Sequence, residues 1–221
     1  MRSRNISKIY LAWRQAKHER RIIVGELYYN KGTYIFKYIT DGVKEAAALG
    51  FVNYPDFPII DKVYSDNVLD VFSQRLYDFS RTDSDEYFEF WDIDPKYKDD
   101  KFYLLAQTQG LLNTDNFEFL ASYHLRKGLS FMSEIANISR NKLSPNLLKV
   151  GDVLNWKKEP DNKYDKNAVI VYKDSTEIGY IKRVHNLVFY DPRAESLIIT
   201  IKDIESHETV TSAFINIKTT L

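Results

Sequence analysis

The stretch Glu159–Tyr172, EPDNKYDKNAVIVY, begins as a polar turn and ends as a strand. Its first half contains Pro160 followed by an Asp-Asn pair, and these residues favour turns because proline fixes φ and Asx side chains bond nearby backbone. Its second half, Asn167–Tyr172, is rich in β-branched residues and predicts a strand. Tyr164 and Asp165 are left near the tip of the loop, where neither is obviously needed by a core.

An exposed ring at this position predicts a contact with a nucleic acid. A tyrosine on a loop can stack on a nucleobase, which is worth ~1–3 kcal/mol per base. Cationic side chains nearby in the sequence could contact phosphates; they are Lys163, Lys166, Lys182 and Arg183. The alternative is an ordinary polar hairpin whose tyrosine packs sideways on its neighbours.

Short strands with turn residues between them surround this stretch and predict a small β-barrel or sandwich. One helix is expected within the series, at Arg183–Tyr190. The polar stretch Asn137–Pro145 fits either a loop inside this unit or a linker before it. The expected strands are Phe117–Tyr123, Leu129–Ile138, Gly151–Lys158, Asn167–Tyr172, Glu177–Lys182, Leu197–Ile204 and Thr209–Lys218.

The first half of the chain predicts a small antiparallel sheet with helices on one side. Three β-rich runs open it, with the turn Asn30-Lys31-Gly32 between the last two. The expected strands are Ser7–Arg14, Ile22–Tyr29 and Thr33–Ile39. The expected helices are Val43–Leu49 capped by Asp41, a helix capped by Ser65 with Val68, Leu69, Phe72, Leu76 and Phe79 on one face, Asp85–Trp91 and Asp99–Gln107.

Composition narrows the class of protein. The 221 residues are 44% hydrophobic and 14% aromatic, which is enough for a sizeable core in one large or two small domains. The formal net charge is zero, so binding to nucleic acid would depend on a local patch. No cysteine and no apolar run long enough to span a membrane are present, and we expect a cytoplasmic protein.

No pattern in the chain encodes a known catalytic or cofactor site. The four histidines lack metal-site spacing, and no phosphate-binding glycine loop, nucleophile elbow or kinase motif occurs. The acidic pairs Asp85/Glu86 and Asp99/Asp100 could serve a nuclease or another hydrolase, but acids at predicted helix starts favour the helix dipole. The sequence therefore predicts a binding protein without metal or cofactor, not an enzyme.

The second half of the chain resembles the HIRAN domain. The resemblance rests on the run from Glu159 to Val169, which fits the family's EPxNxYDxNA turn, and on Ile178-Gly179-Tyr180, which fits the IGY strand about ten residues later. It covers roughly residues 120–221, with Leu129-Ser130-Phe131 in the first strand. The family's fold implies an OB-like, mainly β barrel in residues 120–221. The strand and helix patterns of the first half predict an α+β domain in residues 1–119.

The resemblance also implies a function. The best understood HIRAN domains hold the free 3′ end of single-stranded DNA, with aromatic residues on the bases and an acidic residue near the terminal hydroxyl. By position, Tyr164 would be a stacking ring, Asp165 the acceptor for the 3′ hydroxyl, and Asn162 a residue that shapes the pocket.

Several positions depart from the pattern of the DNA-end binders. Phe131 falls where those proteins have a first-strand tyrosine, so it keeps the ring and loses the hydroxyl. We expect it to be a second exposed ring that stacks on a base and forms an open clamp with Tyr164. Ser130 stands where they have an arginine, which puts end specificity in question. Tyr180 replaces a histidine that often follows the glycine, while Lys182 and Arg183 keep basic groups nearby.

The first half resembles the N-terminal subdomain of HipA-type kinases over about residues 6–119. The resemblance rests on Tyr10-Leu11-Ala12-Trp13, Val24-Gly25-Glu26-Leu27 and Tyr34-Ile35-Phe36-Lys37-Tyr38; the family's NLLP signature is absent. That subdomain contacts partner proteins and holds no catalytic aspartate, and nothing after Phe119 supplies a kinase core. It implies a bacterial adaptor that docks on another protein, in a toxin–antitoxin or phage-defence setting.

Two hypotheses follow. In the first, the chain is a non-enzymatic adaptor whose barrel binds single-stranded DNA or DNA 3′ ends and whose N-terminal domain binds a protein. In the second, it is a regulatory subunit that docks on a HipA-like kinase and does not bind DNA.

Overall fold

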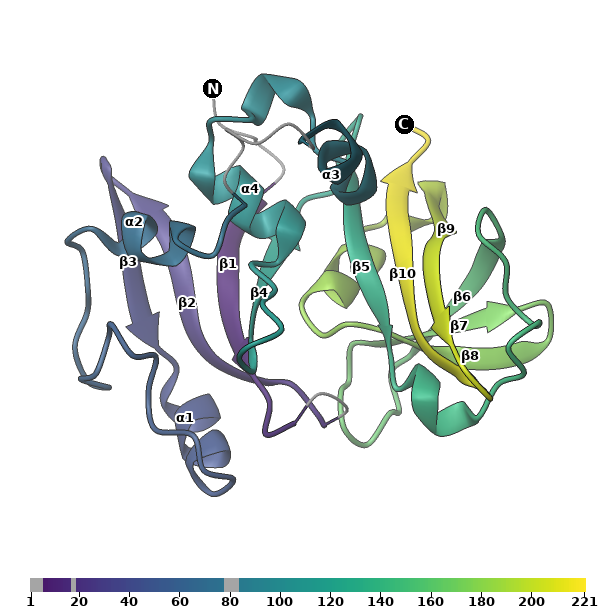
Figure 1. Ribbon diagram of the computed structural model, residues 1–221, viewed down its shortest axis with the longest axis horizontal. Coiled ribbons are helices and arrows are strands. Elements are labelled where there is room, and N and C mark those ends of the chain that lie inside the picture. The colour runs from purple at the N-terminus through teal and green to yellow at the C-terminus, as the bar shows by residue number, and fades with distance from the viewer. Residues whose placement is uncertain (1–5, 17–18, 78–83) are drawn as a thin grey trace. The chain divides into compact units, whose positions relative to one another are not determined.

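The computed structural model describes residues 6–16, 19–77 and 84–221 (Figure 1). Contacts between residues divide the chain into two compact units. The first holds the described residues up to Phe88 together with Ile93–Ser122, and the second holds Glu89–Asp92 together with Tyr123–Leu221.

An antiparallel sheet of four strands, in the order β3-β2-β1-β4, forms the base of the first unit. A hairpin joins β2 to β3 through Lys31 and Gly32, whose φ angles of 43° and 101° suit the tight turn that the sequence predicted. The opening three strands are confirmed. The strands are β1 (Ile6–Trp13), β2 (Ile22–Asn30), β3 (Thr33–Tyr38) and β4 (Phe117–Tyr123).

Helices cover one face of this sheet, as predicted. On β3, Tyr34 and Phe36 point to the same face because side chains alternate along a strand. The Tyr34 ring lies 5.3 Å from Phe102 of α4, and the Phe36 ring lies 5.1 Å from Phe72 of α2. Figure 1 shows both helices across this face. The helices within the first unit are α1 (Thr40–Ala47), α2 (Val68–Ser73), η1 (Pro95–Tyr97) and α4 (Lys101–Thr108), while α3 (Ser84–Trp91) begins in the first unit and ends in the second.

Two helices differ from their predictions. The helix expected from Ser65 is shorter: α2 begins after Asn67, which is left-handed at φ 51°, and ends at Ser73. Leu76 therefore lies beyond it, and Phe79 lies outside the described residues. Asp41 lies within the first turn of α1 instead of capping it. Within the described part of the chain, no helix is both long and apolar enough to cross a membrane.

The strand β4 belongs to a different sheet from the one predicted. Its bounds are as predicted, but it pairs beside β1 in the first sheet, where we expected a strand of the barrel. The Arg14 N–H donates to the Asn116 carbonyl at 3.1 Å, and the Ser7 hydroxyl donates to the Ser122 carbonyl at 3.2 Å. The first sheet thus takes its fourth strand from a distant part of the sequence.

The second unit is a closed barrel of six strands in the order β10-β5-β8-β7-β6-β9. The predicted mainly β, OB-like architecture is confirmed, and the predicted helix at Arg183–Tyr190 is the 3-10 helix η3 (His185–Tyr190). The shorter turns are η2 (Ile138–Asn141) and η4 (Ala194–Ser196). The strands are β5 (Ser130–Ala136), β6 (Val153–Glu159), β7 (Ala168–Lys173), β8 (Thr176–Ile181), β9 (Leu197–Ser206) and β10 (Val210–Thr219).

A buried arginine ties the end of α2 to the start of β4. Arg75 donates to both carboxylate oxygens of Asp115, at 2.6 and 2.8 Å, and its Nε donates to the Gly110 carbonyl at 2.7 Å. The Arg75 side chain is 5% exposed and that of Asp115 is 30% exposed. Burial raises the pKa of Asp115, but hydrogen bonds from Arg75 and from the Phe117 N–H outweigh it, so the pKa lies below its ordinary value.

We expect Asp115→Leu to lower the free energy of unfolding of the first unit by about 3 kcal/mol, because it leaves the buried guanidinium without its counter-ion. Urea denaturation measures this loss. Asp70→Leu is the matched control, since the Asp70–Lys101 pair is exposed on both sides and its loss should cost less than about 1 kcal/mol. Equal losses in the two variants would contradict the role given to Arg75.

The Arg75–Asp115 pair also predicts that stability depends on pH. The pKa of Asp115 is lower in the folded chain than its ordinary value of 3.8, so its contribution to stability is present above that value. It is lost as the pH falls through the lowered folded pKa. The urea midpoint of the wild type should therefore fall below about pH 4 more steeply than that of Asp115→Leu. Parallel curves would show that Asp115 contributes nothing to the acid sensitivity.

Candidate functional site

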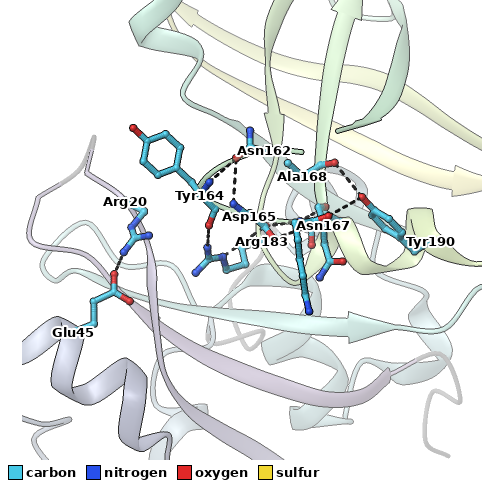
Figure 2. Close-up of polar contacts among 11 residues, drawn as sticks. Arg20, Glu45, Asn162, Tyr164, Asp165, Asn167, Ala168, Arg183 and Tyr190 are labelled. Carbon is cyan, nitrogen blue, oxygen red and sulfur yellow. Dashed lines mark hydrogen bonds and ion pairs between the residues drawn. The ribbon is translucent and has the colours of Figure 1, made fainter. Parts of the chain in front are cut away.

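The loop between β6 and β7 is shaped by the side chain of Asn162. Its Oδ1 accepts hydrogen bonds from the N–H groups of Tyr164, at 3.0 Å, and Asp165, at 3.1 Å, as Figure 2 shows. Its Nδ2 donates to Oε2 of Glu159 at 2.5 Å. One amide therefore satisfies two backbone donors at the loop tip and fixes itself to the end of β6.

Asp165 continues this pattern toward β7. Its Oδ1 accepts the Asn167 N–H at 2.9 Å, and its Oδ2 accepts a hydrogen bond from Nδ2 of Asn186 at 2.9 Å. The guanidinium of Arg183 lies 3.7 Å from the same Oδ2. The carboxylate is thus held by one backbone donor, one amide and one cation, and it keeps lone pairs that could accept a further donor.

Tyr164 presents its ring to solvent from this fixed backbone. The residue is 65% exposed, and Figure 2 shows the ring directed away from the hydrogen bonds of the loop. Its carbonyl accepts a hydrogen bond from Nη2 of Arg183 at 2.8 Å. The ammonium of Lys163 lies 4.7 Å from the ring centroid, and Lys166 is exposed. An open ring beside cations is the arrangement that the sequence predicted for this loop.

Tyr180 of β8 contacts the same glutamate that anchors Asn162 of the loop. Its hydroxyl donates to Oε2 of Glu159 at 3.1 Å, the same oxygen that Asn162 contacts. Burial raises the pKa of Tyr180, and the charge of Glu159 and the hydrogen bond to it raise it further. The preceding Gly179 has φ +149°, and a Cβ there would lie 2.5 Å from the Ala136 carbonyl oxygen. Only glycine lets β8 approach β5 this closely.

Phe131 does not form the second exposed ring that we expected. It is 0% exposed, and its ring stacks on Tyr123 with centroids 4.0 Å apart and planes 20° apart. The His185 ring lies 5.3 Å away on the same buried side. The reason is strand alternation, because Phe131, Ser133 and Ile135 share the inner face of β5. The expectation of an open clamp between Phe131 and Tyr164 is therefore wrong for this structure.

Lys182 is also buried, which corrects its predicted role in contacting phosphate. It is 1% exposed, and its Nζ lies 3.1 Å from Oε2 of Glu134. The hydroxyl of Ser212 donates to the other oxygen of Glu134 at 3.1 Å. A cation enclosed in this way serves the packing of the barrel and not a ligand at its surface.

Ser130 lies in a different hydrogen-bond group. Its hydroxyl accepts from Nδ2 of Asn216 at 3.1 Å, and the same amide donates to Asp92 at 3.1 Å. The structure thus gathers one part of the predicted site around the β6–β7 loop and places Ser130, Phe131 and Lys182 in other groups. The gathered residues are Asn162, Lys163, Tyr164, Asp165, Lys166, Tyr180 and Arg183.

Two residues of η3 that the sequence analysis did not single out also hold this loop. Asn186 donates to Asp165 and, at 2.7 Å, to the Asn167 carbonyl. Tyr190 donates to the carbonyls of Lys166 and Ala168, both at 3.4 Å, as Figure 2 shows for Ala168. The expected helix at Arg183–Tyr190 follows the IGY strand directly, but nothing in its residue pattern indicated contacts with the loop.

The acidic pairs weighed for hydrolysis occupy helix starts. Asp100 caps α4 by accepting the Tyr103 N–H at 3.0 Å, and Asp85 and Glu86 lie in the first turn of α3. In the described ranges, no group of three or more histidine, aspartate or glutamate side chains is placed to hold a metal ion. These positions fit the structural role that the helix dipole gives to acids.

We expect Asn162→Ala to open the loop locally, because the N–H groups of Tyr164 and Asp165 lose their acceptor. The amides of these two residues should exchange with solvent about tenfold faster, as a lost hydrogen bond of average strength predicts. Hydrogen exchange followed by NMR measures the change. Asn146→Ala, in another exposed loop, is the control and should leave both rates unchanged; unchanged rates in Asn162→Ala would exclude its role in the loop.

Comparison with known proteins relates part of this unit to a domain family. Residues 128–204 match the sequence model of the HIRAN domain, which ends inside β9, before the strand β10 that closes the barrel. A crystal structure of the HIRAN domain of human HLTF is similar at 13% identity and a TM-score of 0.33, covering 41% of this chain and 75% of that one. A protein from Lactobacillus plantarum is similar at 18% identity and a TM-score of 0.30, covering 42% and 94%. A search of curated proteins found no match. Residues 128–204 of this chain therefore form a HIRAN domain.

Proposed function

We propose that the chain is a non-enzymatic adaptor whose HIRAN domain holds a single strand of DNA at the β6–β7 loop. The observation that carries the proposal is the Tyr164 ring, which is 65% exposed on a backbone held by Asn162. Aromatic side chains stack on bases without regard to sequence, since each base has a π-face. A ring on a fixed loop loses little conformational freedom when a base stacks on it.

Three cationic side chains of the loop and its neighbourhood could contact the phosphates next to such a base. Lys163 and Lys166 are exposed, and the Arg183 side chain is 35% exposed. Arg183 also bonds the Tyr164 carbonyl, so its charge is fixed next to the ring. Because the proposed phosphate contacts use few cations and the chain carries no net charge, the dependence of binding on salt should be visible but modest.

Asp165 gives the proposed site its preference for a strand end. Each of its oxygens already accepts one strong hydrogen bond from the protein, which orients the carboxylate. The remaining lone pairs suit a hydroxyl donor, whereas a terminal phosphate would bring like charges together. We propose that this hydroxyl is the 3′ hydroxyl of the strand. Ser130, which stands in place of an arginine, has no charge with which to contact the 3′ end of the strand.

The adaptor role assigns the N-terminal unit to a protein partner. This part of the proposal comes from the resemblance of residues 6–119 to the HipA subdomain, which stays a prediction. A second candidate function, a regulatory subunit of a HipA-like kinase that does not bind DNA, is favoured by the burial of Phe131 and Lys182. Co-purification with a kinase and no affinity for oligonucleotides would favour it over the adaptor.

We expect Tyr164→Ala to weaken binding to a labelled single-stranded oligonucleotide by about 5- to 150-fold, the loss of one stacked base. Fluorescence anisotropy at low salt measures the affinity. Tyr164→Phe keeps the ring and should bind as the wild type does.

Tyr29→Ala is the matched control for this measurement, because Tyr29 is an exposed tyrosine of the first unit, at 40% exposure. It should leave the affinity unchanged. Equal and negligible binding by the wild type and Tyr164→Ala would defeat the proposal, and so would equal losses in the Tyr29 and Tyr164 variants.

A further inference from the structure

Asn186 is enclosed in the barrel and bonds two parts of the loop at once. It is 1% exposed, at the start of η3, and lies 21 positions along the chain from Asp165. One proton of its Nδ2 goes to Oδ2 of Asp165 at 2.9 Å, and the other goes to the Asn167 carbonyl at 2.7 Å. Both donors of the amide are therefore used on residues that flank Lys166.

The orientation of this amide is fixed by its partners. Turning it over would aim Oδ1 at the Asp165 carboxylate and the Asn167 carbonyl, so that acceptors would face acceptors. In the orientation present, Oδ1 is buried and has no hydrogen-bond partner. A buried acceptor without a partner is unfavourable. The orientation of the amide is thus explained by the two hydrogen bonds that Nδ2 donates, because Oδ1 accepts none.

Asn186 also controls how Asp165 can turn. Without it, the remaining contact of Oδ2 is with Arg183, whose Nε lies 3.7 Å away. This distance is too long for a hydrogen bond and fixes no angle at the carboxylate, which could then rotate toward the guanidinium. Rotation would move the lone pairs that the proposed function assigns to a hydroxyl.

We propose that Asn186 is the positioning residue that sets the direction of the Asp165 carboxylate and so makes the site distinguish a free 3′ hydroxyl from a blocked 3′ end. The inference rests on the proposed function. Asn186 itself does not touch the strand, because its side chain is enclosed. Its effect should therefore appear in the choice between ends and not in stacking or phosphate contact.

The test compares oligonucleotides of one sequence that end in a 3′ hydroxyl or a 3′ phosphate, with binding measured by fluorescence anisotropy. The wild type should favour the hydroxyl end by about tenfold. Asn186→Leu should reduce this preference to about twofold or less, while its affinity for the phosphate end changes by no more than about twofold. Asn186→Asp keeps the shape without the donors and should lose the preference as well.

A second measurement needs no DNA. The Asn167 N–H donates to Asp165, so in Asn186→Leu this amide should exchange with solvent about tenfold faster. Asn216→Leu is the control: it removes another hydrogen-bonded asparagine of the barrel, the one beside Ser130, and should change neither the end preference nor this exchange rate.

The outcomes separate the two proposals. A wild type that binds neither oligonucleotide, or both equally, overturns end recognition and this inference with it. A wild type that prefers the hydroxyl end while Asn186→Leu keeps that preference overturns the role of Asn186 alone. An unchanged exchange rate of the Asn167 amide in Asn186→Leu also overturns the role of Asn186 alone. Loss of the preference together with faster exchange supports the inference.

Discussion

Side-chain oxygens that accept backbone N–H groups hold the β6–β7 loop, and the candidate site depends on them. A chain that leaves β6 and turns at Pro160 gives its next N–H groups no strand partner, yet half-buried backbone donors need acceptors. Asn162 accepts two of them and Asp165 accepts a third. The exposed ring of Tyr164 is therefore carried by a fixed backbone, and Asp165 takes part both in the loop and in the proposed recognition.

Local patterns predicted most of the elements of the fold, and contacts between distant segments account for the differences. The hairpin at Lys31-Gly32 and the strands of the barrel follow from turn residues and β-branched runs, which act over a few positions. The partner of β4 could not be predicted in this way, because a strand's pattern shows which side is buried and not which edge it joins. The end of α2 is similar: Arg75 leaves the helix to reach Asp115, forty positions further along the chain.

The same distinction separates the parts of the site that were predicted from the rest. Tyr164 is exposed because it lies in a polar loop, and the composition of the loop is enough to predict this. Phe131 and Lys182 lie in or next to strands, where the face decides burial, and a resemblance by position does not carry that information. The contacts of Asn186 with the loop could not be predicted from sequence, since they depend on a 3-10 helix that returns to the loop after the chain has completed β7 and β8.

The stacking of Tyr123 on Phe131 determines which rings of the proposed site can stack on a base. The two rings lie 4.0 Å apart and nearly parallel, which is the arrangement a base would adopt on an open ring. Because that position is filled from within the chain, a strand bound at the loop would stack on Tyr164 and not on Phe131. Neither stacking nor phosphate contact distinguishes one end of a strand from another. Any selectivity of the proposed site would then come from directional hydrogen bonds, and the orientation of the Asp165 carboxylate, not the number of rings, would set it.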